Sequence, residues 1–201
     1  MPSPASRSAI RGQDGGTAMR SPEPGRNALL DAGQRLLSTA DLARISVNAI
    51  VAEAGMAKGS FYQHWPSRDQ YVRALHARFH DQLEGSIAAA MADLPPGPDR
   101  LEAGMNTYLD GCLAEPATKA LLVQSRTEAG LSDLVAARND SAATLIMPDL
   151  LALGWTPPDP IAALLVAATA EIALVELDAG HRDTALRRGL LRLATRTPTA
   201  D

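Results

Sequence analysis

The sequence predicts an all-α protein. Apolar residues recur every three or four positions in one segment after another, glycine and proline separate these segments, and no segment shows the strict alternation of a β-strand. The chain has 201 residues, 46% of them hydrophobic and 21% charged, which suffices for a buried core in one domain or in two small ones. We therefore expect about nine helices, arranged as an N-terminal three-helix unit and a larger C-terminal helical body.

The first helix is expected after a long polar tail. Residues 1–25 contain four prolines, four glycines and four serines and almost nothing to bury, so we expect them to be disordered. Structure is expected from about Arg26, where Leu29, Ala32 and Leu36 fall at helical spacing. A second, short tail is expected at 197–201.

Two short helices and one long helix are expected next. Ser46 is placed to cap a helix over 47–54, which Gly55 ends after about two turns. A second short helix follows over 57–64, and Ser67 then caps a long helix. The apolar stripe of this long helix consists of Val72, Leu75, Phe79, Leu83 and Ile87.

Proline and glycine divide the remainder of the chain into five more helices. A break at 95–98 precedes them, a loop is expected at 154–160, and Pro148 is expected to kink the helix that contains it. The expected ranges are 99–113, 116–126, 131–153, 161–178 and 183–195.

Composition excludes several classes of protein. The single cysteine, Cys112, rules out an internal disulfide and a cysteine zinc cluster. No apolar run reaches the ~18 residues of a membrane span, and no secretory signal is visible at the N-terminus, so we expect a cytoplasmic protein with no membrane partner. His76 and His80 are four residues apart, but no further ligand completes a metal site, and we expect them at the surface. A small all-α enzyme or metal carrier is thus a remote alternative, and no cofactor or metal is expected.

Charge and aromatic residues are both unevenly distributed. Residues 26–80 have a net charge of +3 and residues 81–201 of −8, which suits a chain that meets an anionic partner at one end, although chance also explains a difference of this size. Five of the seven aromatic residues fall within 61–79, where a small three-helix unit needs their buried area.

The segment 46–68 carries the most specific motif. Its two short helices are joined by a tight turn at Gly55, and the second helix presents hydrogen-bond donors and an exposed aromatic ring without any acid. Such a face suits the major groove of DNA, where phosphates repel carboxylates and base edges need hydrogen bonds. The outward residues are Lys58, Gly59, Ser60, Tyr62, Gln63 and His64.

This segment, SVNAIVAEAGMAKGSFYQHWPSR, resembles the DNA-binding region of TetR-type transcriptional regulators. The resemblance covers about residues 26–75 and departs from the family pattern at few positions, among them Ala57, which replaces a serine able to cap the second helix. It implies a helix-turn-helix DNA-binding domain at 26–80, with the motif at 45–64, and a ligand-binding and dimerisation domain at 81–196. It also implies a homodimeric repressor that binds a palindromic operator in double-stranded DNA and is released by a small-molecule effector. An activator or a corepressor-dependent repressor with the same fold is the alternative.

By the same resemblance, Lys58 and Arg68 are expected to bind phosphate and Tyr62 to face DNA. For each of these residues an ordinary structural role, such as a solvated charge or core packing, is the alternative. The remaining candidate DNA contacts are Ser46, Asn48, Gly59, Ser60, Gln63 and His64.

Two further sites are expected in the C-terminal body. Met105, Tyr108, Cys112 and Trp155 are candidates for the lining of a ligand pocket, whose acidic and Ala/Leu-rich surroundings favour an apolar or cationic effector. The helix over 161–178 is apolar all round for nearly three turns and needs cover on every side. Together with the last helix it is expected to form a dimer interface of more than ~2,000 Å² in total. The candidates for that interface are Leu165, Ala168, Ile172 and Leu190.

Overall fold

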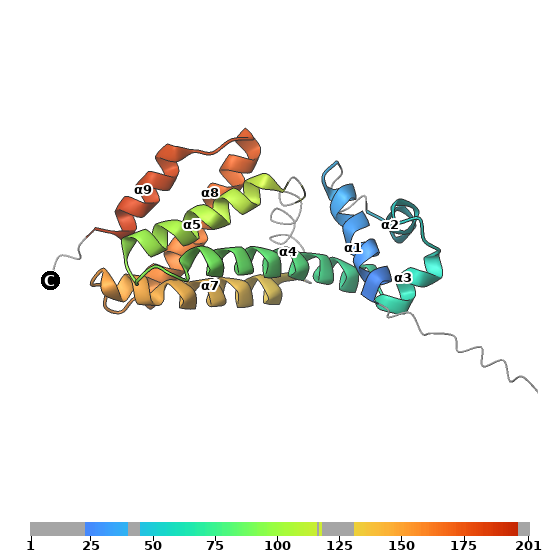
Figure 1. Ribbon diagram of the computed structural model, residues 1–201, viewed down its shortest axis with the longest axis horizontal. Coiled ribbons are helices and arrows are strands. Elements are labelled where there is room, and N and C mark those ends of the chain that lie inside the picture. The colour runs from blue at the N-terminus through green and yellow to red at the C-terminus, as the bar shows by residue number, and fades with distance from the viewer. Residues whose placement is uncertain (1–22, 40–44, 116, 118–130, 197–201) are drawn as a thin grey trace, which may run out of the picture.

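The computed structural model describes residues 23–39, 45–115, 117 and 131–196, and within them every regular element is a helix (Figure 1). The predicted all-α class is therefore confirmed. The described helices are α1 (Glu23–Leu37), α2 (Val47–Glu53), α3 (Lys58–His64), α4 (Arg68–Met91), α5 (Pro98–Ala114), α7 (Ser132–Ala152), α8 (Asp159–Ala179) and α9 (Thr184–Ala194).

The helices form two groups that share α4. Helices α1, α2 and α3 pack on one another at one end of the molecule, and α5, α7, α8 and α9 form a bundle at the other (Figure 1). Helix α4 has 24 residues, a length of about 36 Å. It contacts α1 at its start and α5 further along. The division expected at residue 80 thus falls inside a continuous helix.

Most predicted helices are confirmed to within two residues, because their ends carry local signals. The hydroxyl of Ser46 accepts a hydrogen bond from the Ala49 backbone amide at 3.1 Å, and that of Ser67 accepts one from the Gln70 amide at 3.2 Å. Pro148 lies inside α7, as expected. The helix expected over 116–126 and the tail at 197–201 lie outside the described residues, apart from position 117.

The expected start of structure near Arg26 is wrong. Helix α1 begins at Glu23, so the last three residues of the predicted tail are helical. An acid in the first turn is favourable at a helix N-terminus, and proline is tolerated there because its missing N–H would have no partner. Gly25 also lies close to α3: a Cβ added to it would meet His64 Nε2 at 3.3 Å.

Aromatic side chains fill the core of the N-terminal group, as their clustering in the sequence predicts. Phe61 and Tyr71 are fully buried, and their ring centroids are 5.2 Å apart. Trp65 meets Tyr71 edge to face at 4.9 Å. Together they hold the first turns of α4 against α3.

The bundle contains a buried ion pair that the sequence did not indicate. Glu176 on α8 and Arg187 on α9 are both buried, and the guanidinium donates to the carboxylate at 2.7 Å and 2.5 Å. Arg187 also donates to Asp110 on α5 at 2.7 Å. Buried charges are tolerated only when paired in this way, so the cluster fixes α5, α8 and α9 relative to one another.

Helix α8 is long and apolar enough to cross a membrane by length and composition, which corrects the expectation that no run reaches that length. Only 28% of this stretch is buried within the chain. Leu164 is 66% exposed and Val175 is 40% exposed on the side that its own domain leaves open. The prediction that one protomer cannot cover α8 is confirmed.

The N-terminus of α3 lacks a side-chain cap, which a single substitution can supply. Ala57 occupies the N-cap position with extended backbone and provides no side-chain hydrogen bond to the helix. Replacing Ala57 with serine should therefore raise the free energy of unfolding by about 1 kcal/mol and the midpoint of thermal unfolding by about 2–4 °C, measured by circular dichroism. Ser67→Ala, which removes an existing cap, should lower it; equal stabilities of all three proteins would refute the capping argument.

Candidate DNA-binding surface and effector pocket

The turn between α2 and α3 sets the angle between the two helices. Gly55 has a φ of +64°, a conformation that costs glycine little and other residues more. The Met56 amide donates to the Val51 carbonyl at 2.8 Å, which closes the turn, and the buried side chains of Ile50 and Phe61 pack beneath it. One side of α3 is thereby held against the core and the other faces outward.

The outward side of α3 carries most of the predicted DNA contacts. Lys58, Gly59 and Gln63 are exposed, and Tyr62 is 49% exposed although it is a large aromatic residue. A Cβ added to Gly59 would meet nothing within 4 Å, so no packing within the chain requires glycine there. The helix has no acidic residue, which leaves an open surface able to approach a polyanion.

The remaining candidates lie beside this surface, and most of them already make contacts within the protein. Asn48 is exposed on α2, and Ser46, also exposed, already caps that helix. Ser60 and His64 are half-buried. The imidazole of His64 lies 5.5 Å from the Trp65 ring, which ties it to the core of the unit.

Arg68 is the candidate most engaged within the protein. Its Nε donates to the carbonyl of Ile45 at 2.7 Å, and its side chain is largely covered. This bond joins the first residue of α4 to the residue just before the N-cap of α2. Sequence reasoning assigned Arg68 to DNA phosphate, with a solvated surface charge as the alternative, and missed this bracing contact.

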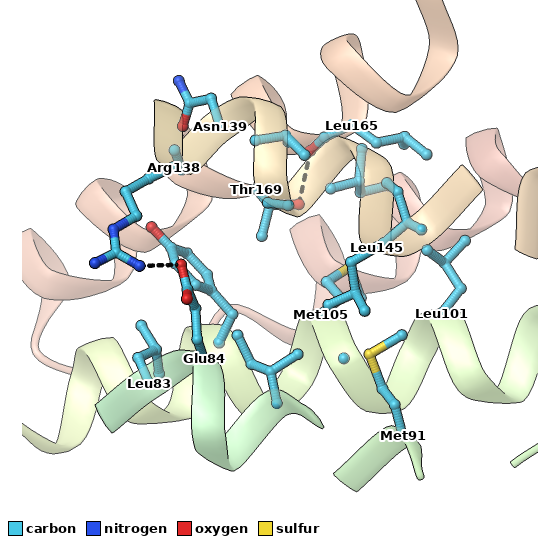
Figure 2. A pocket seen from close by; sticks show the side chains of 18 of the residues that line it. Leu83, Glu84, Met91, Leu101, Met105, Arg138, Asn139, Leu145, Leu165 and Thr169 are labelled. Carbon is cyan, nitrogen blue, oxygen red and sulfur yellow. Dashed lines mark hydrogen bonds and ion pairs between the residues drawn. The ribbon is translucent and has the colours of Figure 1, made fainter. Parts of the chain in front are cut away.

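A cavity of about 130 Å³ lies in the bundle among α4, α5, α7, α8 and α9 (Figure 2). Of the four residues predicted to line a pocket, Met105 and Tyr108 do so. Cys112 and Trp155 do not, and their assignment to the pocket is corrected. Cys112 is fully buried in the core, where burial raises the pKa of its thiol to about 12, and the indole of Trp155 donates to the Ala194 carbonyl at 2.8 Å.

The cavity has a polar end that sequence reasoning missed. Arg138 on α7 donates to Glu84 on α4 at 2.6 Å and also pairs with Asp81, one turn earlier on α4. Glu84 and Arg138 both line the cavity. Their pairing joins segments more than 50 residues apart in the sequence, so no local pattern indicated it.

His76 and His80 are not surface residues, contrary to the expectation. His76 is 1% exposed, its ring lies 4.3 Å from that of His80, and His80 lines the cavity. Burial, followed by the nearby positive charge of Arg138, lowers the pKa of His76 to about 4. For His80, burial and then the His76 ring lower the pKa to about 3.

Three of the four predicted dimer residues are already covered within one protomer. Leu165, Ile172 and Leu190 are buried, and Leu165 and Leu190 line the cavity, while Ala168 is half-buried. Because α8 is apolar on all sides, periodicity alone did not distinguish its inner face from its outer face. The large apolar side chains that are exposed on α8 and α9 are instead Leu164, Val175, Leu186 and Leu193.

The geometry defines a class of protein. It is an all-α protein in which one continuous helix joins a helix-turn-helix unit to a bundle that holds a cavity. Residues 29–75 match the model of the bacterial regulatory proteins of the tetR family. Among relatives, an uncharacterised HTH-type transcriptional regulator of Mycobacterium tuberculosis is 30% identical over 141 residues, which are 70% of this chain and 68% of that protein. The HTH-type transcriptional regulator EthR of Mycolicibacterium smegmatis is 28% identical over 92 residues, 45% of this chain and 42% of its own.

Solved structures agree with the fold. A TetR-like transcriptional regulator from Rhodococcus sp. RHA1 superposes with a TM-score of 0.69 at 22% identity, covering 85% of this chain and 93% of that one. A tetR-family regulator from Streptomyces coelicolor gives 0.65 at 20% identity, covering 86% and 78%. The chain belongs to the TetR family of transcriptional regulators. Its relatives are DNA-binding regulators and not enzymes.

The buried histidines make the stability of the protein sensitive to acid. In the unfolded chain a histidine binds its proton near pH 6.5, whereas His76 stays neutral in the folded protein until about pH 4. The unfolded state therefore binds more protons as the pH falls through this window, and stability is lost. Between pH 7 and 4.5, wild-type protein should lose about 2 kcal/mol more unfolding free energy than His76→Leu, measured by urea denaturation.

A matched control is His181→Leu, which makes the same substitution at an exposed position. If His76→Leu and wild type lost stability in parallel, His76 would not be the acid-sensitive group.

Proposed function

We propose that this protein is a ligand-responsive transcriptional repressor of the cytoplasm that binds a palindromic DNA operator as a homodimer and is released by a small-molecule effector. The observation that carries the proposal is the outward surface of α3, where Lys58, Tyr62 and Gln63 are exposed without a neighbouring acid on the helix. Base edges are read in the major groove by such donors, and phosphates are bound by cations beside them.

The proposed DNA-binding domain comprises α1 to α3 and the start of α4, to about residue 80, and the ligand-binding and dimerisation domain continues to residue 196. Within the first domain, Lys58 and Arg68 bind phosphate, Tyr62 lies against the DNA, and the other contacts come from α3 and from the N-terminus of α2. These remaining contacts are Ser46, Asn48, Gly59, Ser60, Gln63 and His64.

A second copy of the chain is the proposed partner for the open side of α8 and α9. On α8, Leu164 and Val175 are eleven residues apart, which is three turns, and α9 adds Leu186 and Leu193. A Cβ added to Gly189 between them would meet nothing within 4 Å, so another helix has room to approach closely. Glu171 lies exposed on the same side of α8, which favours a protein partner over hydrocarbon.

The operator is palindromic in this proposal because a two-fold axis relates the two protomers. Half-sites then lie about one helical turn, ~34–36 Å, or a multiple of it apart. Helix α4 connects the pocket to α3, since His80 and Met91 line the cavity and the same helix begins four residues after α3 ends. An effector that displaces α4 thus changes the spacing of the two α3 helices and releases the operator.

Replacing Lys58 with alanine should weaken binding to operator and to random DNA alike. It should also lower the slope of log affinity against log salt by about one unit, because one phosphate contact is lost. The measurement is fluorescence anisotropy over a series of salt concentrations.

Lys58→Arg is the control for that variant, because it keeps the charge and should keep the slope. An unchanged slope in Lys58→Ala would show that Lys58 does not contact phosphate, and operator binding that resists high salt would contradict the proposed function itself.

Replacing Leu164 with glutamate should give monomers and abolish operator binding, because a charge would enter the centre of the proposed dimer contact. Sedimentation velocity at micromolar concentration measures the change. Leu151→Glu is the matched control: Leu151 is also an exposed leucine, at 55%, but lies on α7, and its variant should remain a dimer. A folded wild-type monomer would contradict the dimer.

A further inference from the structure

We infer that the effector is a compact apolar molecule bearing a single cationic amine, with the amine bound at Glu84 and the apolar part lying among the bundle helices. This inference deepens the proposed function and rests on it for the role of the cavity. The apolar lining, the two carboxylates that share Arg138 and the acceptor oxygen of Thr169 point to this class of ligand.

The apolar side of the cavity determines the size of the apolar part of the ligand. Figure 2 shows Arg138 and Glu84 together at one side of the pocket, and Met91, Met105 and Leu101 gathered at the other. A cavity of about 130 Å³ is close to the roughly 150 Å³ that takes up benzene when it is lined by apolar side chains, so about six carbon atoms fit. Methionine lining adapts to ligands of different shape.

The one cationic side chain among the described residues of the polar end is shared between two carboxylates, of which Glu84 lines the cavity. The charged side chains among the described lining residues are Glu84 and Arg138. Arg138 is shared with Asp81 as well, so that one guanidinium faces two carboxylates. His80, the remaining titratable group of the lining on α4, is neutral at neutral pH because its pKa lies near 3.

An anionic ligand is disfavoured at this end for a definite reason. It would have to compete with Glu84 and Asp81 for Arg138 and would add a third negative charge beside them. A cationic amine instead completes the neutralisation of the two carboxylates. Glu84 has about half of its side chain exposed, so an amine reaches it without displacing the core.

The hydroxyl of Thr169 adds a second reason. It donates its hydrogen to the Leu165 carbonyl at 2.7 Å (Figure 2). Its oxygen therefore presents only acceptor capacity to the cavity that it lines. An ammonium head has three donors and no acceptor, so it matches both Thr169 and Glu84, whereas a carboxylate matches neither.

The test uses three probes with the same six-carbon chain: hexylamine, hexan-1-ol and hexanoate. Binding to the full-length protein is measured by isothermal titration calorimetry and by ligand-observed NMR at pH 7.5. The expected order of affinity is amine first, then alcohol, then carboxylate. Hexanoate as the tightest ligand, or no detectable binding of hexylamine, would overturn the proposal.

Glu84→Gln gives the sharper result because it changes two affinities in opposite directions. Hexylamine should bind about fivefold more weakly, since the charge that holds the amine is lost. Hexanoate should bind more tightly, since a repelling charge is gone and Arg138 has one competitor fewer. Hexan-1-ol should change by less than twofold, which reports that the cavity is intact.

Glu102→Gln is the matched control. Glu102 is an exposed carboxylate on α5 outside the cavity, and its variant makes the same change in charge and should leave all three affinities unchanged. Equal effects of both variants on hexylamine would overturn the assignment of Glu84. Operator binding, followed separately by anisotropy, distinguishes the two proposals: an amine that binds at Glu84 without releasing DNA leaves the ligand class standing and contradicts release by an effector.

Discussion

The hydrogen bond from Tyr71 to the carbonyl of Leu29, at 2.7 Å, fixes the start of α4 inside the core of the N-terminal unit. The Tyr71 ring is fully buried against Phe61 and Trp65, and α1 comes so close that a Cβ added to Gly33 would meet the Tyr71 hydroxyl at 1.9 Å. No flexible linker therefore separates the candidate DNA-binding surface from the bundle. Because α4 continues unbroken to Met91, the direction of α3 is set by the helix that also forms one wall of the cavity.

Helices α4 and α7 are joined by exposed ion pairs rather than by a buried aromatic core. Arg73 pairs with Asp133 at 2.8 Å, and Arg138 pairs with Glu84 at 2.6 Å. In each ion pair the carboxylate is substantially exposed to water. Exposed ion pairs contribute little to stability, because water screens the charges and the side chains lose freedom when they pair. Breaking the aromatic core around Tyr71 would expose large apolar side chains and therefore costs more than separating these ion pairs. Movement of α4 thus carries α3 with it.

The sequence predicted the helices well because their ends depend on local chemistry. Serine caps at Ser46 and Ser67, and the left-handed turn at Gly55, each act within a few residues. What failed required knowledge of the neighbours in space. The periodicity of α8 has no preferred side, so adjacent Leu164 and Leu165 were indistinguishable although one is exposed and the other lines the cavity. In the same way, His76 was taken for a surface residue because nothing in the sequence showed that this side of α4 is buried in the fold.

Buried ion pairs in the bundle determine which helices around the cavity are held in place. Glu176 and Arg187 are buried and joined to each other and to Asp110, so separating α5, α8 and α9 would leave charges without partners in an apolar interior. Buried charge pairs thus hold that side of the cavity together, and the same helices α8 and α9 carry the exposed large apolar side chains. Helix α7 is also held by a buried charge, because Asp149 accepts hydrogen bonds from Arg100 on α5 at 2.7 Å and from the Gly97 amide at 3.0 Å. The ion pairs that join α4 to α7, by contrast, lie at the surface. In the proposed switch, a ligand that needs space would therefore displace α4, and α3 with it, rather than the helices of the proposed dimer contact.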